Sequence, residues 1–237
     1  MAWRSSGESL AELVGNLCAN RMITDDRVKQ AFLSVDRAHY ATRSPYKDAP
    51  QSIGHGVTIS APHMHALAVQ HLMPYVVPDA AEGRGGPRIL DIGSGSGYLT
   101  HLLAELAGPQ GEVVGVEHIS ELCETGRANM AKSEGGRAHL ESGQVKFVVG
   151  DGRKGAPSPL ADGGFDAIHV GASAAKLHTE LLDQLRSPGR IFIPMDDEGD
   201  HGAGNQSVWT IDKAADGTVT KKRLFGVRYV PLTDAPR

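Results

Sequence analysis

Apolar residues near the start of the chain recur three or four positions apart, which is the spacing of one face of a helix. This pattern predicts a first helix from about residue 10, behind a capping box formed by Ser9 and Glu12. The same spacing predicts a second helix over about 25–35. Thr24 is expected to cap it, because a threonine hydroxyl accepts a hydrogen bond from a free amide of the first turn.

The helical pattern breaks up over 36–62, where prolines and glycines interrupt the apolar positions. We expect an ordered loop here, because both residue types favour turns over regular helix. Pro62 then stands where the first turn of a helix tolerates proline, and apolar residues continue at helical spacing to about residue 72. Residues 74–87 are expected to connect this helix to the next element.

From residue 88 onward, short apolar runs alternate with amphipathic segments, the pattern of a parallel sheet with covering helices. Strands are predicted at 88–92, 112–117, 144–149, 165–170 and 190–195. Helices are predicted at 97–107, 119–132 and 176–186, and a surface loop at 133–139. Apolar runs at 208–212 and 219–230 flank a turn and predict an antiparallel hairpin at the sheet edge. The expected fold class is α/β, with a doubly wound, mostly parallel sheet.

The chain has 237 residues, 40% of them hydrophobic, which is enough to bury a sizeable core. A single domain over 1–237 is expected, with 1–75 as a helical and loop region and 88–237 as the α/β core. The formal charge of -4 lacks the basic excess that binds phosphate backbones, so no nucleic-acid partner is expected. Cys18 and Cys123 lack disulfide or metal spacing, and no segment resembles a membrane span. We therefore expect a cytoplasmic protein without a membrane partner.

The strongest chemical signal is the run RILDIGSGSGYLT at 88–100. Its three alternating glycines allow a tight turn that brings a ligand against the backbone where a helix begins. Asp91 precedes them, and its carboxylate would repel a dinucleotide pyrophosphate but attract the positive groups of S-adenosylmethionine. The dinucleotide motif also requires glycine or alanine where this chain has Tyr98. The loop therefore favours S-adenosylmethionine.

Carboxylates also end the next two predicted strands. Glu117 stands where it can accept hydrogen bonds from both ribose hydroxyls of an adenosine, although the same position suits a helix cap. His118 is expected to line the adenine pocket. Asp151, followed by Gly152, is placed to accept from the adenine amino group, although Asp-Gly pairs are also common in simple turns.

The segment 50–65 is a second cluster of polar groups. Its hydroxyls precede a proline-initiated helix whose free amides can hold an anion, so an acceptor carboxylate is expected there. Ser60 lacks the elbow motif of a hydrolase nucleophile. No metal is expected, because no cysteine or acid stands at ligand spacing from the four histidines of this region, which are His55, His63, His65 and His71.

Together these motifs resemble the protein-L-isoaspartate (D-aspartate) O-methyltransferases of the eukaryotic type, over nearly the whole chain. The glycine loop is common to many methyltransferases, whereas the run TISAPHMH at 58–65 is specific to this family. Further matching runs are DRAHYA at 36–41, VVGDGR at 148–153, FDAIHVGA at 165–172 and VPLTD at 230–234. The resemblance implies a monomer with the seven-stranded, Rossmann-like class I methyltransferase fold, N-terminal helices and a C-terminal antiparallel hairpin.

The resemblance also implies an activity. The enzyme would move a methyl group from S-adenosyl-L-methionine to the free α-carboxylate of L-isoaspartyl and D-aspartyl residues in damaged proteins, leaving S-adenosyl-L-homocysteine. The ester would then pass through a succinimide to normal aspartate. Ser60 would be catalytic, with Thr58, Ile59 and His65 in the substrate site. The implied cofactor residues are Asp91, Gly93, Ser94, Gly95, Glu117, His118, Asp151, Gly152 and Thr233.

Other activities stay open from the residues alone. A methyltransferase of another carboxylate or of RNA would use the same glycine loop, although RNA requires a basic surface that the composition lacks. A dinucleotide oxidoreductase and a non-catalytic S-adenosylmethionine-binding module are the alternatives outside this class. Turnover on an isoaspartyl peptide discriminates among them.

Overall fold

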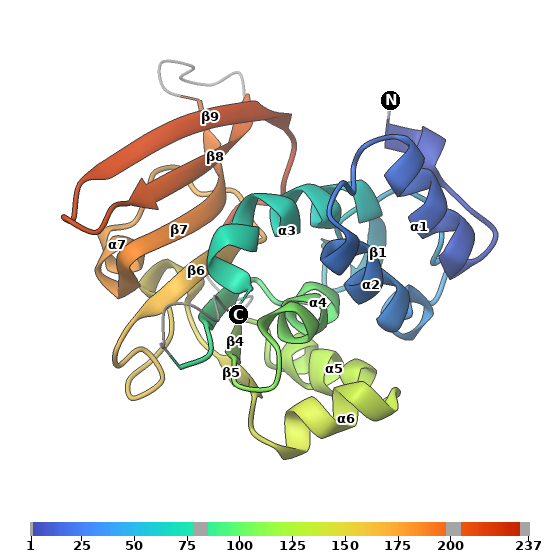
Figure 1. The fold of residues 1–237 in the computed structure, drawn as a ribbon, viewed down its shortest axis with the longest axis horizontal. Helices are drawn as coiled ribbons and strands as arrows, with labels where there is room; N and C mark the ends of the chain where they lie inside the picture. The colour runs from blue at the N-terminus through green and yellow to red at the C-terminus, as the bar shows by residue number, and fades with distance from the viewer. Residues whose placement is uncertain (1, 78–84, 198–204, 233–237) are drawn as a thin grey trace.

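The computed structural model describes residues 2–77, 85–197 and 205–232. A seven-stranded sheet forms its centre, in the order β5-β4-β3-β6-β7-β8-β9 (Figure 1). The strands are β3 (Arg88–Ile92), β4 (Glu112–Glu117), β5 (Val145–Val149), β6 (Phe165–Val170), β7 (Leu185–Asp196), β8 (Gln206–Lys213) and β9 (Val219–Val227). The first five run parallel, and β8 and β9 extend the sheet in antiparallel pairs. The predicted sheet and its edge hairpin are confirmed.

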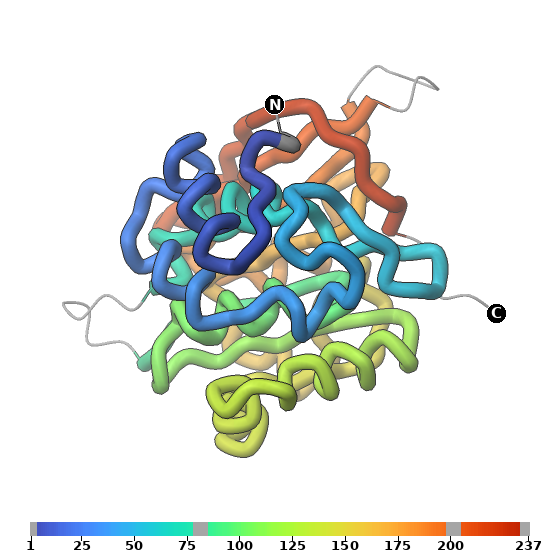
Figure 2. The backbone as a smooth tube through the Cα atoms, turned by 90° about the vertical axis from the view of Figure 1, so that its right-hand side faces the viewer, coloured from blue at the N-terminus to red at the C-terminus, as the bar shows by residue number. Residues whose placement is uncertain are grey.

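Helices cover both faces of this sheet, unequally. They are α1 (Leu10–Ala19), α2 (Asp26–Ser34), α3 (Pro62–Val76), α4 (Tyr98–Ala107), α5 (Ser120–Met130), α6 (Glu134–Glu141) and α7 (Thr179–Gln184). Successive strand residues point to opposite faces, so Ile89 joins the core beneath α1–α5, whereas Leu90 joins the core on the side of α7. Figure 2 looks onto the N-terminal helices, which lie in front of the sheet. Within the described ranges, no helix has the length and apolar character needed to cross a membrane.

Of the two N-caps predicted from the sequence, the structure contains one. The Ser9 hydroxyl accepts from the amide of Glu12 at 3.2 Å, as the capping-box pattern predicts. The second helix is capped by Asp25, which accepts from the Arg27 amide at 2.8 Å, so the prediction of a Thr24 cap is wrong. Thr24 instead donates its hydroxyl to Oε1 of Gln70 at 2.7 Å and ties the start of α2 to α3.

Three segments differ from the sequence prediction. The expected loop over 36–62 contains a short antiparallel hairpin, β1 (Gln51–Gly54) with β2 (Val57–Ile59). The expected loop at 133–139 forms most of α6, because Ser133 caps it by accepting from an amide of its first turn at 3.1 Å. The helix expected at 176–186 is only α7, since β7 already pairs with β6 at Leu185.

The glycine loop allows α4 and α5 to approach closely. Gly97 precedes α4 with φ +83°, a left-handed conformation that residues with a Cβ rarely adopt. A Cβ on Gly97 would lie 2.8 Å from the carbonyl oxygen of Gly126 in α5. Gly97 therefore serves both the turn and the packing of the two helices.

Gly97→Ala should lower the free energy of unfolding more than Gly143→Ala. Both glycines have positive φ, which costs an alanine about 1–2 kcal/mol, but open space surrounds the Cβ position of Gly143. Crowding against α5 should add about 1–3 kcal/mol at Gly97. Urea unfolding of the two variants measures the difference, and equal losses would contradict the packing role.

Candidate active site

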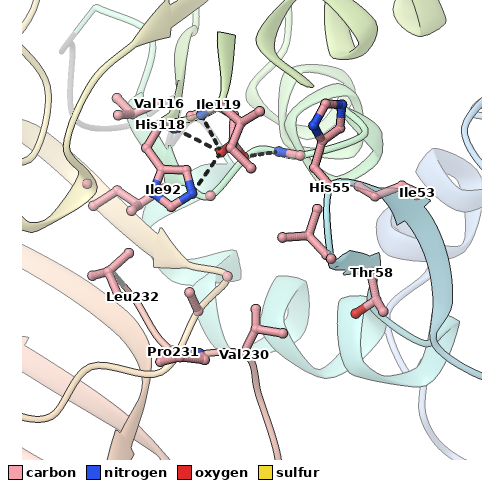
Figure 3. Close-up of a pocket in the computed structure, with 18 residues that line it drawn as sticks. Ile53, His55, Thr58, Ile92, Val116, His118, Ile119, Val230, Pro231 and Leu232 are labelled. Atoms are coloured by element: carbon pink, nitrogen blue, oxygen red, sulfur yellow. Dashed lines mark hydrogen bonds and ion pairs between the residues drawn. The ribbon is translucent and has the colours of Figure 1, made fainter. Parts of the chain in front are cut away.

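A cavity of about 300 Å³ opens at the carboxyl ends of β3, β4 and β6. Open α/β sheets bind ligands where the strand order reverses, and here β4 and β6 flank β3 on opposite sides. The hairpin β1–β2 and the segment 230–232 close the remaining sides. Figure 3 shows Ile53, His55 and Thr58 of the hairpin facing Ile92, Val116 and Ile119 across the cavity, with Val230, Pro231 and Leu232 along its edge.

Glu117 organises the polar end of this cavity. One carboxylate oxygen, Oε2, accepts from the amide of Gly95 at 3.0 Å. The other, Oε1, accepts from the amides of His118 at 2.8 Å and Ile119 at 3.1 Å. These contacts fix the glycine loop relative to the start of α5. A carboxylate has about four acceptor positions, so one remains for a ligand hydroxyl.

Asp91 lies behind the glycine loop and not on the cavity wall. Its side chain is 1% exposed. The hydroxyl of Thr100 in α4 donates to Oδ2 at 2.6 Å, and Nδ1 of His169 in β6 lies 2.8 Å from Oδ1. Asp91 therefore supports the loop and places a negative charge beneath it.

The structure brings only part of the implied cofactor set to the cavity. The lining members are Gly93, Gly95, Glu117, His118 and Gly152. Ser94 is buried, and within the described part of the chain its hydroxyl has no hydrogen-bond partner. Asp151 caps the turn that presents Gly152, and hydrogen bonds from Arg153 lower the pKa of its carboxyl. Thr233 lies outside the described residues.

A second cavity of about 670 Å³ adjoins the first. The two cavities share four lining residues, which are Thr58, Gly171, Val230 and Pro231. Ser60 lines only the second cavity, together with Tyr229. Burial raises the pKa of the Tyr229 hydroxyl, and a hydrogen bond with the Ser60 side chain opposes that rise. Ser60 therefore faces the second cavity, whereas the glycine loop lines the first.

Arg37 fixes the backbone of Ser60 by a hydrogen bond. Its guanidinium is fully buried over the Tyr98 ring and donates from Nη2 to the Ser60 carbonyl at 2.7 Å. Burial lowers the pKa of Arg37 to about 10, so it stays charged at neutral pH. Sequence reasoning missed Arg37, although it lies in the matching run at 36–41.

His65 and Ile59 lie beneath the second cavity and not on its wall. His65 is buried with Nδ1 3.3 Å from Nη1 of Arg37. Burial and the Arg37 charge hold the pKa of His65 well below its usual value, so it is neutral and accepts from the guanidinium. Ile59 belongs to the hydrophobic core. Of the four residues implied for catalysis and substrate binding, Thr58 and Ser60 line one or both of these two cavities, and Ile59 and His65 line neither.

The free amides at the start of α3 do not form the expected anion site. Oδ1 of Asp48, a residue with a fully buried side chain, accepts from the His63 amide at 3.0 Å and lies 2.7 Å from His63 Nδ1. The protein's own carboxylate already occupies the helix terminus. The start of α3 is therefore not free to hold an acceptor carboxylate.

A family model described as protein-L-isoaspartate(D-aspartate) O-methyltransferase matches residues 8–237. The chain belongs to this family. The enzyme of this name from Caenorhabditis elegans is 43% identical, over 98% of this chain and 96% of the relative. Protein-L-isoaspartate O-methyltransferase 1 of Arabidopsis thaliana is 42% identical, over 93% of this chain and 90% of the relative.

Solved structures agree with the family assignment. A Plasmodium falciparum protein, crystallised as a candidate protein-L-isoaspartate O-methyltransferase with S-adenosyl-L-homocysteine, is 34% identical with a TM-score of 0.83. The match covers 96% of this chain and 99% of that chain. A further protein-L-isoaspartate O-methyltransferase, 23% identical with a TM-score of 0.75, has the same fold. The seven-stranded sheet is thus that of an S-adenosylmethionine-dependent methyltransferase.

Proposed function

We propose that this chain transfers a methyl group from S-adenosyl-L-methionine to the free α-carboxylate of L-isoaspartyl and D-aspartyl residues in damaged proteins. Its family membership supports the reaction, and the S-adenosyl-L-homocysteine bound to the Plasmodium relative supports the cofactor. The observation that carries the proposal is the wall shared by the two cavities. A donor in the first cavity meets an acceptor in the second beside Thr58.

The residues of the first cavity fit an adenosyl ligand. Ile92, Val116 and Ile119 provide apolar walls for a flat ring, and Glu117 offers an acceptor to the ribose hydroxyls. We assign cofactor contacts to Gly93, Gly95, Glu117, His118 and Gly152, with Asp91, Ser94 and Asp151 supporting the loops that carry them. S-adenosyl-L-methionine, when bound, supplies an electrophilic methyl group on a positively charged sulfur. The buried charge of Asp91 favours that positive group.

The residues of the second cavity align the acceptor and need not remove a proton from it. A carboxylate is ionised near neutral pH and is already the reactive form. The Ser60 hydroxyl donates a hydrogen bond to one carboxylate oxygen, and Arg37 fixes the Ser60 backbone from below. Thr58 and residues 230–231 form part of the wall between this acceptor and the methyl donor. Holding two reactants in one geometry accounts for a large part of such a rate enhancement.

The proposal extends to the state of the molecule in the cell. We propose a single-domain monomer in the cytosol, with neither nucleic-acid nor membrane partners. One hydrophobic core joins residues from α1 to β8, which supports a single domain. Cys18 and Cys123 are free thiols, which suits a reducing compartment. The formal charge of -4 disfavours binding to phosphate backbones.

Methyl transfer to an isoaspartyl peptide and to its normal aspartyl twin tests the activity. With labelled S-adenosyl-L-methionine, the isoaspartyl peptide should gain label and its twin should not. Equal labelling of both peptides, or of neither, would overturn the assignment.

The same assay tests the role of Ser60 against a matched hydroxyl. Ser60→Ala should lower kcat about 10- to 100-fold, because it removes one hydrogen bond to a charged group. Its affinity for S-adenosyl-L-homocysteine should not change. Ser52→Ala, on β1 and outside both cavities, should retain full kcat. An unchanged kcat in Ser60→Ala would remove this residue from the mechanism.

Glu117→Gln should weaken S-adenosyl-L-homocysteine binding about 10- to 100-fold. Glutamine has one acceptor oxygen, so at least one of the three backbone amides would face an NH₂ group without a partner, at about 1–3 kcal/mol. Glu112→Gln, at the opposite end of β4, is the control and should bind normally. Isothermal titration calorimetry measures both affinities. Equal affinities would show that Glu117 does not organise the site.

A further inference from the structure

Three side chains of the types that bind metal ions lie close together, outside both cavities of the active site. His101 and Glu105 stand one turn apart on α4, and His139 comes from α6. Among the described residues, they form the one group of three whose ligand atoms all lie within 4.8 Å of one another. None of them lines either cavity of the active site. The proposed methyl transfer gives this cluster no role.

The distances within the cluster suit a tetrahedral ion. Oε1 of Glu105 lies 3.3 Å from Nε2 of His101 and 3.1 Å from Nε2 of His139. An ion with ligand bonds of about 2.0–2.1 Å separates neighbouring tetrahedral ligands by about 3.3 Å. Little movement is needed for these two edges of the tetrahedron.

The proton on His139 is fixed by its outer partner. Nδ1 of His139 lies 2.6 Å from Oε1 of Gln144. The Gln144 amide nitrogen donates to the carbonyls of Ala104 and Gly108, which orients its oxygen toward His139. Because that oxygen only accepts, Nδ1 carries a proton. Without a metal, Nε2 hydrogen-bonds with Oε1 of Glu105, which raises the pKa of His139, so a bound ion would replace the proton on Nε2.

His101 presents its own Nε2 atom in the same way. The residue is 1% exposed, and Nε2 has the ion-pair contact with Glu105 at 3.3 Å but makes no hydrogen bond within the described part of the chain. Its Nδ1 lies 2.6 Å from the Tyr40 hydroxyl, an oxygen that can accept the Nδ1 proton. A histidine ligand with its second nitrogen bonded to an outer oxygen is the usual arrangement at metal sites. A cation among the three atoms would satisfy this buried nitrogen.

We propose that His101, Glu105 and His139 bind one Zn²⁺, with water as the fourth ligand. Two imidazoles and a carboxylate are common zinc ligands. The side chains of Glu105 and His139 are 27% and 17% exposed, which gives the ion and its water access from solvent. The ion links α6 to α4. This link matters because α6 has eight residues, including Gly135 and Gly136, and glycine disfavours helix.

Zinc titration of the metal-free wild-type chain tests the proposal, with competition against a chromophoric chelator. One equivalent of Zn²⁺ should bind. Glu105→Gln and His139→Gln should each weaken binding by about 100-fold or more, since even loss of an outer-shell partner costs about 10–100-fold. His178→Gln removes a histidine outside the cluster and should bind like wild type. No zinc binding by the wild type, or equal binding by all four proteins, overturns the proposal.

Thermal unfolding separates a specific site from adventitious surface binding. Free Zn²⁺ at 100 times its Kd should shift the folding equilibrium of the wild type about 100-fold toward the folded state. The His139→Gln variant, checked first for native circular dichroism, should lose this shift. Gln144→Met removes no ligand but removes the outer partner of His139, together with the two hydrogen bonds to Ala104 and Gly108, and should weaken binding about tenfold. A zinc-induced shift that persists in both Glu105→Gln and His139→Gln would place the ion elsewhere.

Discussion

A single buried carboxylate joins three elements that meet behind the glycine loop. Asp91 is the last residue but one of β3, and its two oxygens contact Thr100 of α4 and His169 of β6. A buried charge without such partners is strongly destabilising, so these contacts specify how α4 and β6 sit around β3. The glycine loop between β3 and α4 takes its path from this arrangement. Glu117 then fixes the loop from the opposite side, through the amide of Gly95.

Two regions of the chain supply complementary halves of the site. The α/β core provides the glycine loop and the strand ends, which suit the methyl donor. The N-terminal region provides Thr58 and Ser60. The buried, charged guanidinium of Arg37 supports Ser60 by a hydrogen bond to its carbonyl. The donor half is built from loops between parallel strands, whereas the acceptor half depends on contacts between residues distant in sequence.

This division explains what could be predicted from the sequence. The strands and the loop that follows β3 were predictable because their signals are local, being apolar runs and glycines in alternation. Ser60 and Thr58 were found through a family motif. The Asp48–His63 contact, the Arg37 support and the burial of His65 were not predictable, because each depends on packing between segments far apart in the chain. The same limit applies to metal ligands. The histidines at 55–71 that were considered as ligands are close in sequence, whereas His101 and His139 come from different helices and are brought together only by the fold.

The segment 230–232 is short, yet it forms part of both cavities. Its hold on the core includes two backbone hydrogen bonds, from the Ser173 amide to the Val230 carbonyl at 2.8 Å and from the Leu232 amide to the Ser173 carbonyl at 2.7 Å. Under the proposed function, a ligand in either cavity therefore contacts the same wall. By thermodynamic linkage, any change that the donor makes in the affinity for the acceptor equals the change that the acceptor makes in the affinity for the donor, in whichever order they bind.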